Sequence, residues 1–491
     1  MQCNIKKLLI AVAVISLPFF SVLKSQDLKS ESNAVILPNG WKLSPTGKLL
    51  PLGDLPLNIA IAPSKKLAAI TNNGESDQTI QLVDIEKGKI LDSVIIGKAW
   101  LGLTFSADSK YLYASGGNDN IIIRYSTSAN RLIAYDTIRI GEAWPEEISV
   151  AGICLDDQAN RLYAVTKEDN SLYVIDTRLR KVISHVPLGG QGYTCLLSPD
   201  HKNLYISCWG CDKVIIFSTV EQKITGNVPV GDNPNDMCIT GNGRYLFVAN
   251  ANDNSVSVID TKQLKVIETL NSALYPGSPE GSTPNSVSLS SDEKTLYIAN
   301  ADNNCLAVFN VSKPGNSESK GFIPTAWYPT CVRTAGNKIL VSNGKGLSSH
   351  ANPFGPNPAR KGGTVVYQAA GQQKEIKVQY IGGLLRGTLQ IIDTPDASQM
   401  AAFSETVYKN TPYNKTRELI SEGAAGNPTE DLGTHQLSDA AEAVDGRFGG
   451  GWRARYHRVI PREGRVLGQE TQRTLDPYRK GADRGSAAPL V

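Results

Sequence analysis

The chain has 491 residues, 41% of them apolar and 20% charged, so most of it is able to bury a core. The formal net charge of +3 is close to balance. This balance excludes the strongly basic stripe by which many proteins bind nucleic acid, and we expect no nucleic-acid partner.

The N-terminus has the pattern of a secretory signal peptide. Lys6 and Lys7 precede an apolar run from Leu8 to Leu23, and cleavage would remove residues 1–25. The alternative is a membrane anchor, although the run is slightly shorter than the ~17–25 residues of most membrane spans. No other apolar run is long enough to cross a bilayer. We therefore expect an exported protein of the periplasm or cell surface, with no transmembrane segment after cleavage.

Residues 40–53 (GWKLSPTGKLLPLG) resemble the ends of two later segments, 181–189 (KVISHVPLG) and 222–231 (QKITGNVPVG). Unlike those segments, this piece precedes the first repeat of the chain. An open sheet edge exposes unpaired backbone groups, so a ring of sheets needs a strand that closes it. The sequence therefore predicts that 40–53 forms the outer edge of the last repeat.

A repeat of two short strands, each followed by a turn, runs through the chain from about residue 62. Clear copies are 198–217, 240–261 and 290–309, and weaker copies are 62–85, 106–125 and 156–177. Seven equivalent positions recur 42 to 50 residues apart: Ala68, Leu112, Leu162, Leu204, Leu246, Leu296 and Leu340. This period and number are typical of a propeller with four short strands per blade. We predict an all-β fold over residues 40–400, a seven-bladed β-propeller of four-stranded antiparallel blades.

The segment Tyr245–Thr261 (YLFVANANDNSVSVIDT) resembles the central motif of the YVTN-type β-propeller repeats. The resemblance extends over about residues 40–400 and implies the propeller fold. It implies little about function, because such repeats serve adhesion, surface-layer and scaffold roles as well as enzymes.

Six cysteines of the repeats are candidates for redox or metal chemistry. Cys208 and Cys211 form a Cys-x-x-Cys on a strand hairpin, where a local disulfide or free thiols are expected rather than a redox pair or half of a metal site. The others occupy the innermost strands and are expected to be small core residues rather than a ring of channel thiols: Cys154, Cys195, Cys238 and Cys331.

One face of the propeller is the candidate binding surface. In a propeller, the loops that lead into the inner strands and the hairpins between the second and third strands project from the same face. Aromatic and amide side chains around a concave mouth suit sugar, peptide or protein recognition. The alternative is that the asparagines serve left-handed turns and the aromatics cap blade ends. The candidate ligand-binding residues are Trp100, Tyr193, Trp209, Asn235, Asn250, Asn285, Asn300, Trp327, Tyr328 and His350.

The seventh repeat carries an insertion at residues 344–379, between a second strand at 338–342 and a third strand at 387–393. Loops of this length inside a compact fold are usually functional or disordered. We expect the insertion to be a lid over the mouth of the channel, with His350 in it.

The region after the insertion suggests that a C-terminal domain is missing. Residues 380–416 resemble the join, in a class of exported proteins, between a YVTN propeller and a phosphoesterase domain of the alkaline-phosphatase superfamily. Residues 401–423 are expected to be a linker and 424–491 a disordered tail, which has nine Arg but one Lys. This tail is too short for a phosphoesterase domain. It is expected to be an out-of-frame or fusion product, or else a natural basic tail.

The sequence contains no complete catalytic set and indicates no cofactor, although a divalent metal in the channel is compatible with it. Histidines are few and scattered. We therefore predict a binding or docking platform for a protein or glycan partner rather than an enzyme. One alternative is the propeller portion of a truncated metal-dependent phosphoesterase, and a weaker one is a stand-alone propeller hydrolase such as a lactonase.

Overall fold

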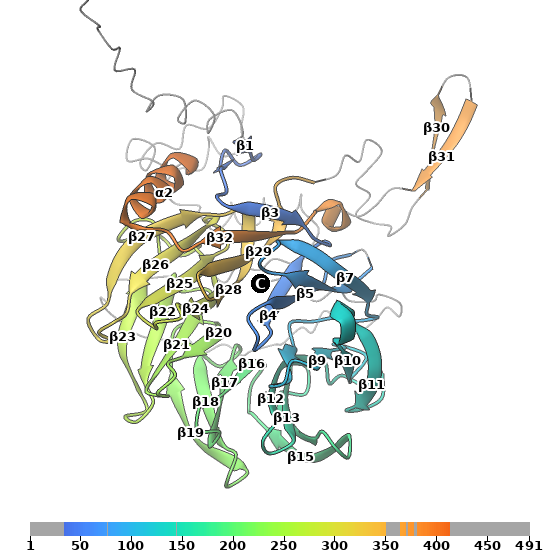
Figure 1. The fold of residues 1–491 in the computed structure, drawn as a ribbon, viewed down its shortest axis with the longest axis vertical. Coiled ribbons are helices and arrows are strands. Elements are labelled where there is room, and N and C mark those ends of the chain that lie inside the picture. The colour runs from blue at the N-terminus through green and yellow to red at the C-terminus, as the bar shows by residue number, and fades with distance from the viewer. Residues whose placement is uncertain are drawn as a thin grey trace, which may run out of the picture.

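The computed structural model describes residues 34–75, 77–143, 145–349, 364–369, 372–377 and 381–412. These residues form seven four-stranded antiparallel blades arranged in a ring (Figure 1). The predicted all-β propeller is confirmed. The predicted signal peptide, most of the insertion including His350, and the tail from residue 424 lie outside the described residues.

Each of the first six blades is a meander of four consecutive strands, ordered from the channel outward. Blades 1 to 3 consist of β4 (Pro56–Ile61), β5 (Leu67–Asn72), β6 (Thr79–Asp84), β7 (Lys89–Ile95); β8 (Leu103–Phe105), β9 (Tyr111–Ser115), β10 (Ile121–Ser126), β11 (Ile133–Arg139); and β12 (Val150–Asp156), β13 (Arg161–Thr166), β14 (Ser171–Asp176), β15 (Lys181–Pro187). Blades 4 to 6 consist of β16 (Gly192–Leu197), β17 (Asn203–Cys208), β18 (Lys213–Ser218), β19 (Lys223–Pro229); β20 (Pro234–Ile239), β21 (Tyr245–Asn250), β22 (Ser255–Asp260), β23 (Lys265–Asn271); and β24 (Pro284–Leu289), β25 (Thr295–Asn300), β26 (Cys305–Asn310), β27 (Glu318–Pro324).

The seventh blade joins the two ends of the propeller. Its strands, from the channel outward, are β28 (Trp327–Ala335), β29 (Lys338–Gly346), β32 (Thr388–Asp393) and β3 (Lys48–Pro51). The outermost strand therefore comes from the N-terminal segment, as predicted, and β3 pairs antiparallel with β32. Gln390 of β32 is fully buried and donates to the backbone oxygens of Thr46 (2.6 Å) and Pro324 (3.1 Å). Backbone pairing and this amide both help to close the ring.

The repeated leucines form the core between blades. All seven equivalent positions, from Ala68 to Leu340, are fully buried on the second strand of their blade. The inner strands contact one another in sequence, and β28 meets β4 to complete the circle. Because successive strand residues alternate in direction, each second strand buries residues toward both neighbouring blades. The core is therefore a set of layers between blades rather than one central cluster.

In blades 2, 4, 5 and 6, an asparagine or aspartate in the hairpin between the second and third strands ties the blade to the next one. Asn120, Asp212, Asn254 and Asn304 have a left-handed backbone (φ between 48° and 54°), which suits tight turns. Their side-chain oxygens accept from backbone N–H groups at the start of the next blade; for example, the Tyr328 N–H donates to Asn304 Oδ1 at 2.9 Å. The repeated Asn-rich turns thus hold neighbouring blades together.

A helix that the sequence analysis did not predict follows blade 7. Helix α2 (Ala397–Asn410) begins with a capping box formed by Asp396 and Gln399, and it packs against β27 (Figure 1). It also contacts β2 (Lys42–Leu43), which pairs with β1 (Val35–Ile36). Part of the expected linker 401–423 is therefore helical. Among the described residues, no helix is long and apolar enough to cross a bilayer.

Two described strands lie within the predicted insertion. They are β30 (Thr364–Ala369) and β31 (Gln372–Lys377), which pair antiparallel. In Figure 1 this hairpin projects outward from the ring and does not cover its centre. The start of the insertion, by contrast, remains part of blade 7, because β29 extends to Gly346.

Candidate functional site

An ion pair joins two inner strands at the central channel. Arg333 of β28 donates from Nη1 to Asp236 Oδ2 (2.6 Å) and from Nη2 to Asp236 Oδ1 (3.2 Å). Its guanidinium also donates to Ser286 Oγ (3.0 Å) and Asn58 Oδ1 (3.2 Å). Burial lowers the pKa of Arg333, but the neighbouring Asp236 carboxylate outweighs this and raises it, so the arginine stays charged.

The cavity left beside this ion pair is about 30 Å³. It is lined by residues of several inner strands, among them Asn58, Tyr193, Asn285, Thr330 and Arg333. A volume of this size holds water but not a sugar or a lactone. A sugar or lactone therefore does not fit in this cavity, and the mouth above it is the candidate binding surface.

Three residues of blade 7, one buried and two half-buried, form a cluster at the mouth. Lys345 Nζ lies 4.3 Å from the ring centroid of Tyr328 and 5.4 Å from that of Trp327. Tyr328 has a left-handed backbone (φ 65°), which is rare for a bulky residue and is fixed here by the bond from its N–H to Asn304. Trp327 and Lys345 are half-buried. We name Trp327, Tyr328 and Lys345 the mouth cluster.

The ionisable groups of the mouth cluster have shifted pKa values. Burial raises the pKa of Tyr328, and the Asp302 carboxylate raises it further. Burial lowers the pKa of Lys345, and Asp302 opposes part of that shift. Asp302 itself accepts from Thr283 Oγ1 (2.6 Å). Desolvation by the surrounding protein atoms raises the pKa of its carboxyl group. The mouth therefore holds an amine that loses its proton more easily than an exposed lysine.

The lowered pKa predicts that Lys345 is acetylated at lower pH than an exposed lysine. Lys223, which ion-pairs with Glu221 at 2.8 Å, serves as the reference. Glu221 raises the pKa of Lys223, whereas the pKa of Lys345 is lowered. Only the neutral amine is acylated, so the acetylation rate of Lys345 should reach its midpoint at a lower pH. Mass spectrometry of both peptides after brief acetylation between about pH 7 and 11 measures the two midpoints. Equal midpoints would contradict the environment described for Lys345.

The structure brings some of the predicted site residues together. Tyr193 is the second residue of β16, and its pKa is raised by burial and by Asp236. Asn285 is buried, hydrogen-bonds to Tyr328, and accepts from Asn235 Nδ2 (3.3 Å). Tyr193, Asn235, Asn285 and Tyr328 thus surround the top of the channel, beside Trp327.

Other predicted site residues lie apart from this group. Asn250 and Asn300 are fully buried; Asn250 donates to Ser255 and Ser257 within its blade, and Asn300 donates to the Ser272 backbone oxygen (2.6 Å). Asn250 thus joins two strands of its own blade and Asn300 joins blades 5 and 6, and both are buried away from the surface. Two half-buried tryptophans are on separate blades: Trp100, on which Lys167 stacks at 5.0 Å, and Trp209, next to the Cys208–Cys211 disulfide.

The inner-strand cysteines follow the expectation of core residues. Cys195 and Cys331 are buried, Cys154 and Cys238 are half-buried, and burial raises the pKa of Cys154 to about 11. Their thiols therefore stay protonated and unreactive near neutral pH. Within the described ranges, no three His, Cys, Asp or Glu residues are grouped so that they could hold a metal ion.

Sequence reasoning missed Lys345, Asp302 and the Asp236–Arg333 pair. Asp236 and Arg333 did carry a signal, since a charged residue interrupts each of these inner strands (PNDMCI and CVRTA). Nothing in the sequence indicated that the two residues, 97 positions apart, meet across the channel. Lys345 was hidden in the insertion, whose first residues prove to belong to a strand.

Comparison with known proteins supports the propeller fold and gives a family match for part of the chain. Residues 193–346 match the family described as "Lactonase, 7-bladed beta-propeller". The chain is similar to "Antigen Lp49" of Leptospira interrogans serogroup Icterohaemorrhagiae serovar copenhageni, with 26% identity over 181 residues. That match covers 32% of this chain and 37% of the relative, so the chain spans well under half of that relative's length.

Solved structures with little sequence identity have the same architecture. "Kuenenia stuttgartiensis Hydrazine Synthase" matches with a TM-score of 0.50 and 16% identity, covering 59% of this chain and 93% of that one. "Crystal structure of RRP9 WD40 repeats" matches with a TM-score of 0.53 and 11% identity, covering 70% and 97%. At such identities these likenesses concern the fold alone. The chain is a seven-bladed β-propeller, part of which resembles the lactonase-type propellers.

Proposed function

We propose that this chain is an exported binding platform that holds a protein or glycan partner at the mouth of its propeller. The observation that carries the proposal is the mouth cluster. Trp327 and Lys345 remain partly accessible, and the buried ring of Tyr328 lies beside the lysine, above the cavity of about 30 Å³ next to the Arg333–Asp236 pair. Aromatic side chains with a polar group beside them bind the flat faces of sugars and of protein side chains.

A second candidate is a lactone hydrolase, which the family match over residues 193–346 favours. Its chemistry would use the same surface, because Lys345 has a lowered pKa and lies beside Tyr328. A phosphoesterase-associated role, expected from the resemblance of residues 380–416, stays a prediction. Binding and turnover by the purified chain separate these functions.

The proposed binding is tested with variants of the mouth cluster. Binding of the purified chain to a glycan array and to candidate surface proteins is measured first, and the affinity of each hit is then measured for Trp327→Ala and Lys345→Ala. Loss of an aromatic anchor costs about 2 kcal/mol, so Trp327→Ala should weaken binding about 30-fold. Trp209→Ala, on the same face of another blade, is the matched control and should change affinity little. Unchanged affinity in Trp327→Ala and Lys345→Ala would place the binding surface elsewhere.

A further inference from the structure

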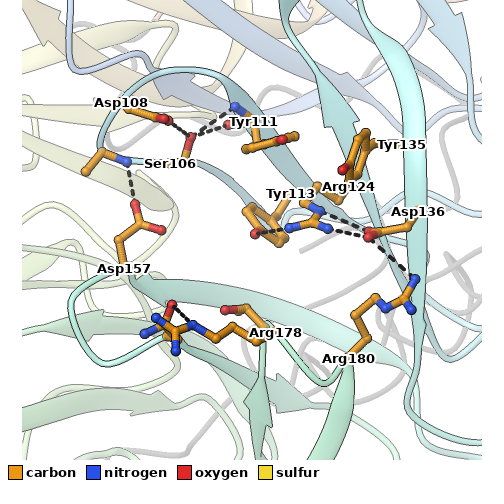
Figure 2. Close-up of a pocket in the computed structure, with 13 residues that line it drawn as sticks. Ser106, Asp108, Tyr111, Tyr113, Arg124, Tyr135, Asp136, Asp157, Arg178 and Arg180 are labelled. Atoms are coloured by element: carbon orange, nitrogen blue, oxygen red, sulfur yellow. Dashed lines mark hydrogen bonds and ion pairs between the residues drawn. The ribbon is translucent and has the colours of Figure 1, made fainter.

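A second hollow lies between blades 2 and 3, away from the channel. It has a volume of about 660 Å³, which is within the usual range for small-ligand sites. Its walls come from the turns after β8 and β12, the strands β9 to β11, and the β14–β15 turn (Figure 2). These turns lie at the opposite ends of the strands from the mouth cluster, so this site is independent of the proposed function. We name it the blade 2–3 groove.

An arginine that breaks the internal repeat forms the floor of this groove. Arg124 is the fourth residue of β10, and the equivalent residue of five other blades is a buried aliphatic: Leu82, Val174, Ile216, Val258 and Val308. In blade 7 the equivalent is Gln390, which closes the ring. Stability of the blade therefore does not demand an arginine here. The presence of Arg124 at this position favours a role in ligand binding.

Arg124 is held in place but keeps free donors. It donates from Nε to Asp136 Oδ1 (3.0 Å), from Nη2 to Asp136 Oδ2, and from Nη1 to the Tyr113 hydroxyl (3.3 Å). Its guanidinium lies 4.9 Å from the ring centroid of Tyr111 and 4.8 Å from that of Tyr135. A guanidinium has five N–H groups, so two have no hydrogen-bond partner among the described residues.

Two more arginines come from the β14–β15 turn: Arg180 points toward Asp136 beside Arg124, whereas Arg178 points toward the Asp157 end of the groove (Figure 2). Arg178 donates to Asn160 Oδ1 (3.0 Å), a neutral amide. Arg180 Nη1 lies 3.9 Å from Asp136 Oδ2, but Arg124 already balances the charge of that carboxylate. The Arg180 side chain is 56% exposed. Within the described part of the chain, neither arginine has a carboxylate of its own. The groove therefore offers positive charge and forked donors that suit a carboxylate.

The other walls suit the remainder of a sugar. Tyr135 is 59% exposed, so its ring can contact the apolar C–H face of a pyranose. At the far end, Asp157 uses Oδ2 to accept from the Ala107 N–H, and its Oδ1 has no hydrogen-bond partner among the described residues. A free carboxylate oxygen accepts from sugar hydroxyls and repels a bare anion. The mixture disfavours inorganic phosphate and favours a ligand with one acidic end and one hydroxylated end.

From these contacts we propose that the blade 2–3 groove binds an acidic saccharide of the hexuronate type. The sugar carboxylate would lie between Arg124 and Arg180, the ring would pack on Tyr135, and hydroxyl groups at the other end would donate to Asp157 and accept from Arg178.

Calorimetric titration of the purified full chain tests this site, with trigalacturonate as the probe. Its methyl ester, which has the same rings without charge, should bind at least about 10-fold more weakly, a loss comparable to one charge-assisted hydrogen bond. Triglutamate and inorganic phosphate test other anions and should also bind more weakly. No binding of trigalacturonate, or equal binding of the methyl ester, triglutamate or phosphate, would overturn the proposal.

Variants locate the binding. Arg178→Ala/Arg180→Ala should abolish most binding, whereas the control Arg139→Ala, an exposed arginine of β11 outside the groove, should retain it. Arg124→Val/Asp136→Ser copies the paired residues Val174 and Ser184 of blade 3, so it should fold normally and still lose the ligand. Thermal unfolding of each variant reports on the fold. Retained binding in either groove variant would contradict the site.

Discussion

A chain that begins at Leu52 is expected to lose about 5 kcal/mol or more of its unfolding free energy, compared with a chain that begins at Ala34. Removal of residues 34–51 deletes β3 and leaves the backbone of β32 unpaired at an open edge. It also removes Leu37, Trp41 and Leu43, which are buried in one cluster with Val407 of α2. Each buried apolar side chain of this size contributes about 1.5–3 kcal/mol, so the loss approaches the whole stability of a typical domain.

Guanidinium-induced unfolding of the two chains measures this difference. The chain that begins at Ala34 is the matched control, because it lacks the same signal-like N-terminus but keeps the closing strand. It should unfold cooperatively, whereas the shorter chain should unfold at much lower denaturant concentration or without a sharp transition. If both chains unfold at the same concentration, the N-terminal strand does not close the ring.

Asp236→Ala is expected to lower the unfolding free energy by about 3 kcal/mol, because it leaves Arg333 without its counter-ion inside the channel. The carboxylate also accepts from Ser286 Oγ (2.6 Å) and from the Val287 N–H (3.2 Å), so it links blades 5, 6 and 7. About a quarter of the Arg333 side chain is exposed, which puts the estimate at the low end for a buried ion pair.

The double variant Asp236→Ala/Arg333→Leu separates the charge effect from lost packing. It carries no unpaired charge and should recover much of the stability lost in Asp236→Ala. Lys223→Ala, in an exposed pair with Glu221, is the surface control and should change stability by less than about 0.5 kcal/mol. If Asp236→Ala lowers the unfolding free energy by less than about 1 kcal/mol, the ion pair does not stabilise the inner strands.

The repeat made the propeller predictable because every blade uses the same buried anchor. Leu246 and its equivalents lie at the same place on the second strand, so their spacing counts the blades. The closing role of residues 48–51 was predictable for the same reason, since their sequence resembles an outer strand. Helix α2 was missed although its signals are local: the capping box of Asp396 and Gln399, and apolar residues at Met400, Phe403 and Val407.

The candidate sites were less predictable because their residues converge from separate blades. Asn250 and Asn300 share the motif of the hairpins, yet the fold buries them completely. Lys345 meets Trp327 and Tyr328 only because β29 pairs with β28 beyond the predicted end of the strand. Arg124 could have been singled out in the sequence as the charged member of IIIRYS, but its partners come from two blades. Periodicity reports burial within a strand and not which loops meet in space.

The most direct test of the binding-platform proposal is a turnover assay with the purified chain. Hydrolysis of γ- and δ-lactones, phosphomonoesters and phosphodiesters is followed with and without added zinc or calcium. The proposal predicts no hydrolysis above the uncatalysed rate from a chain that still binds its partner at the mouth cluster. Hydrolysis that is lost in Lys345→Ala would contradict it and would make the mouth of the propeller an active site.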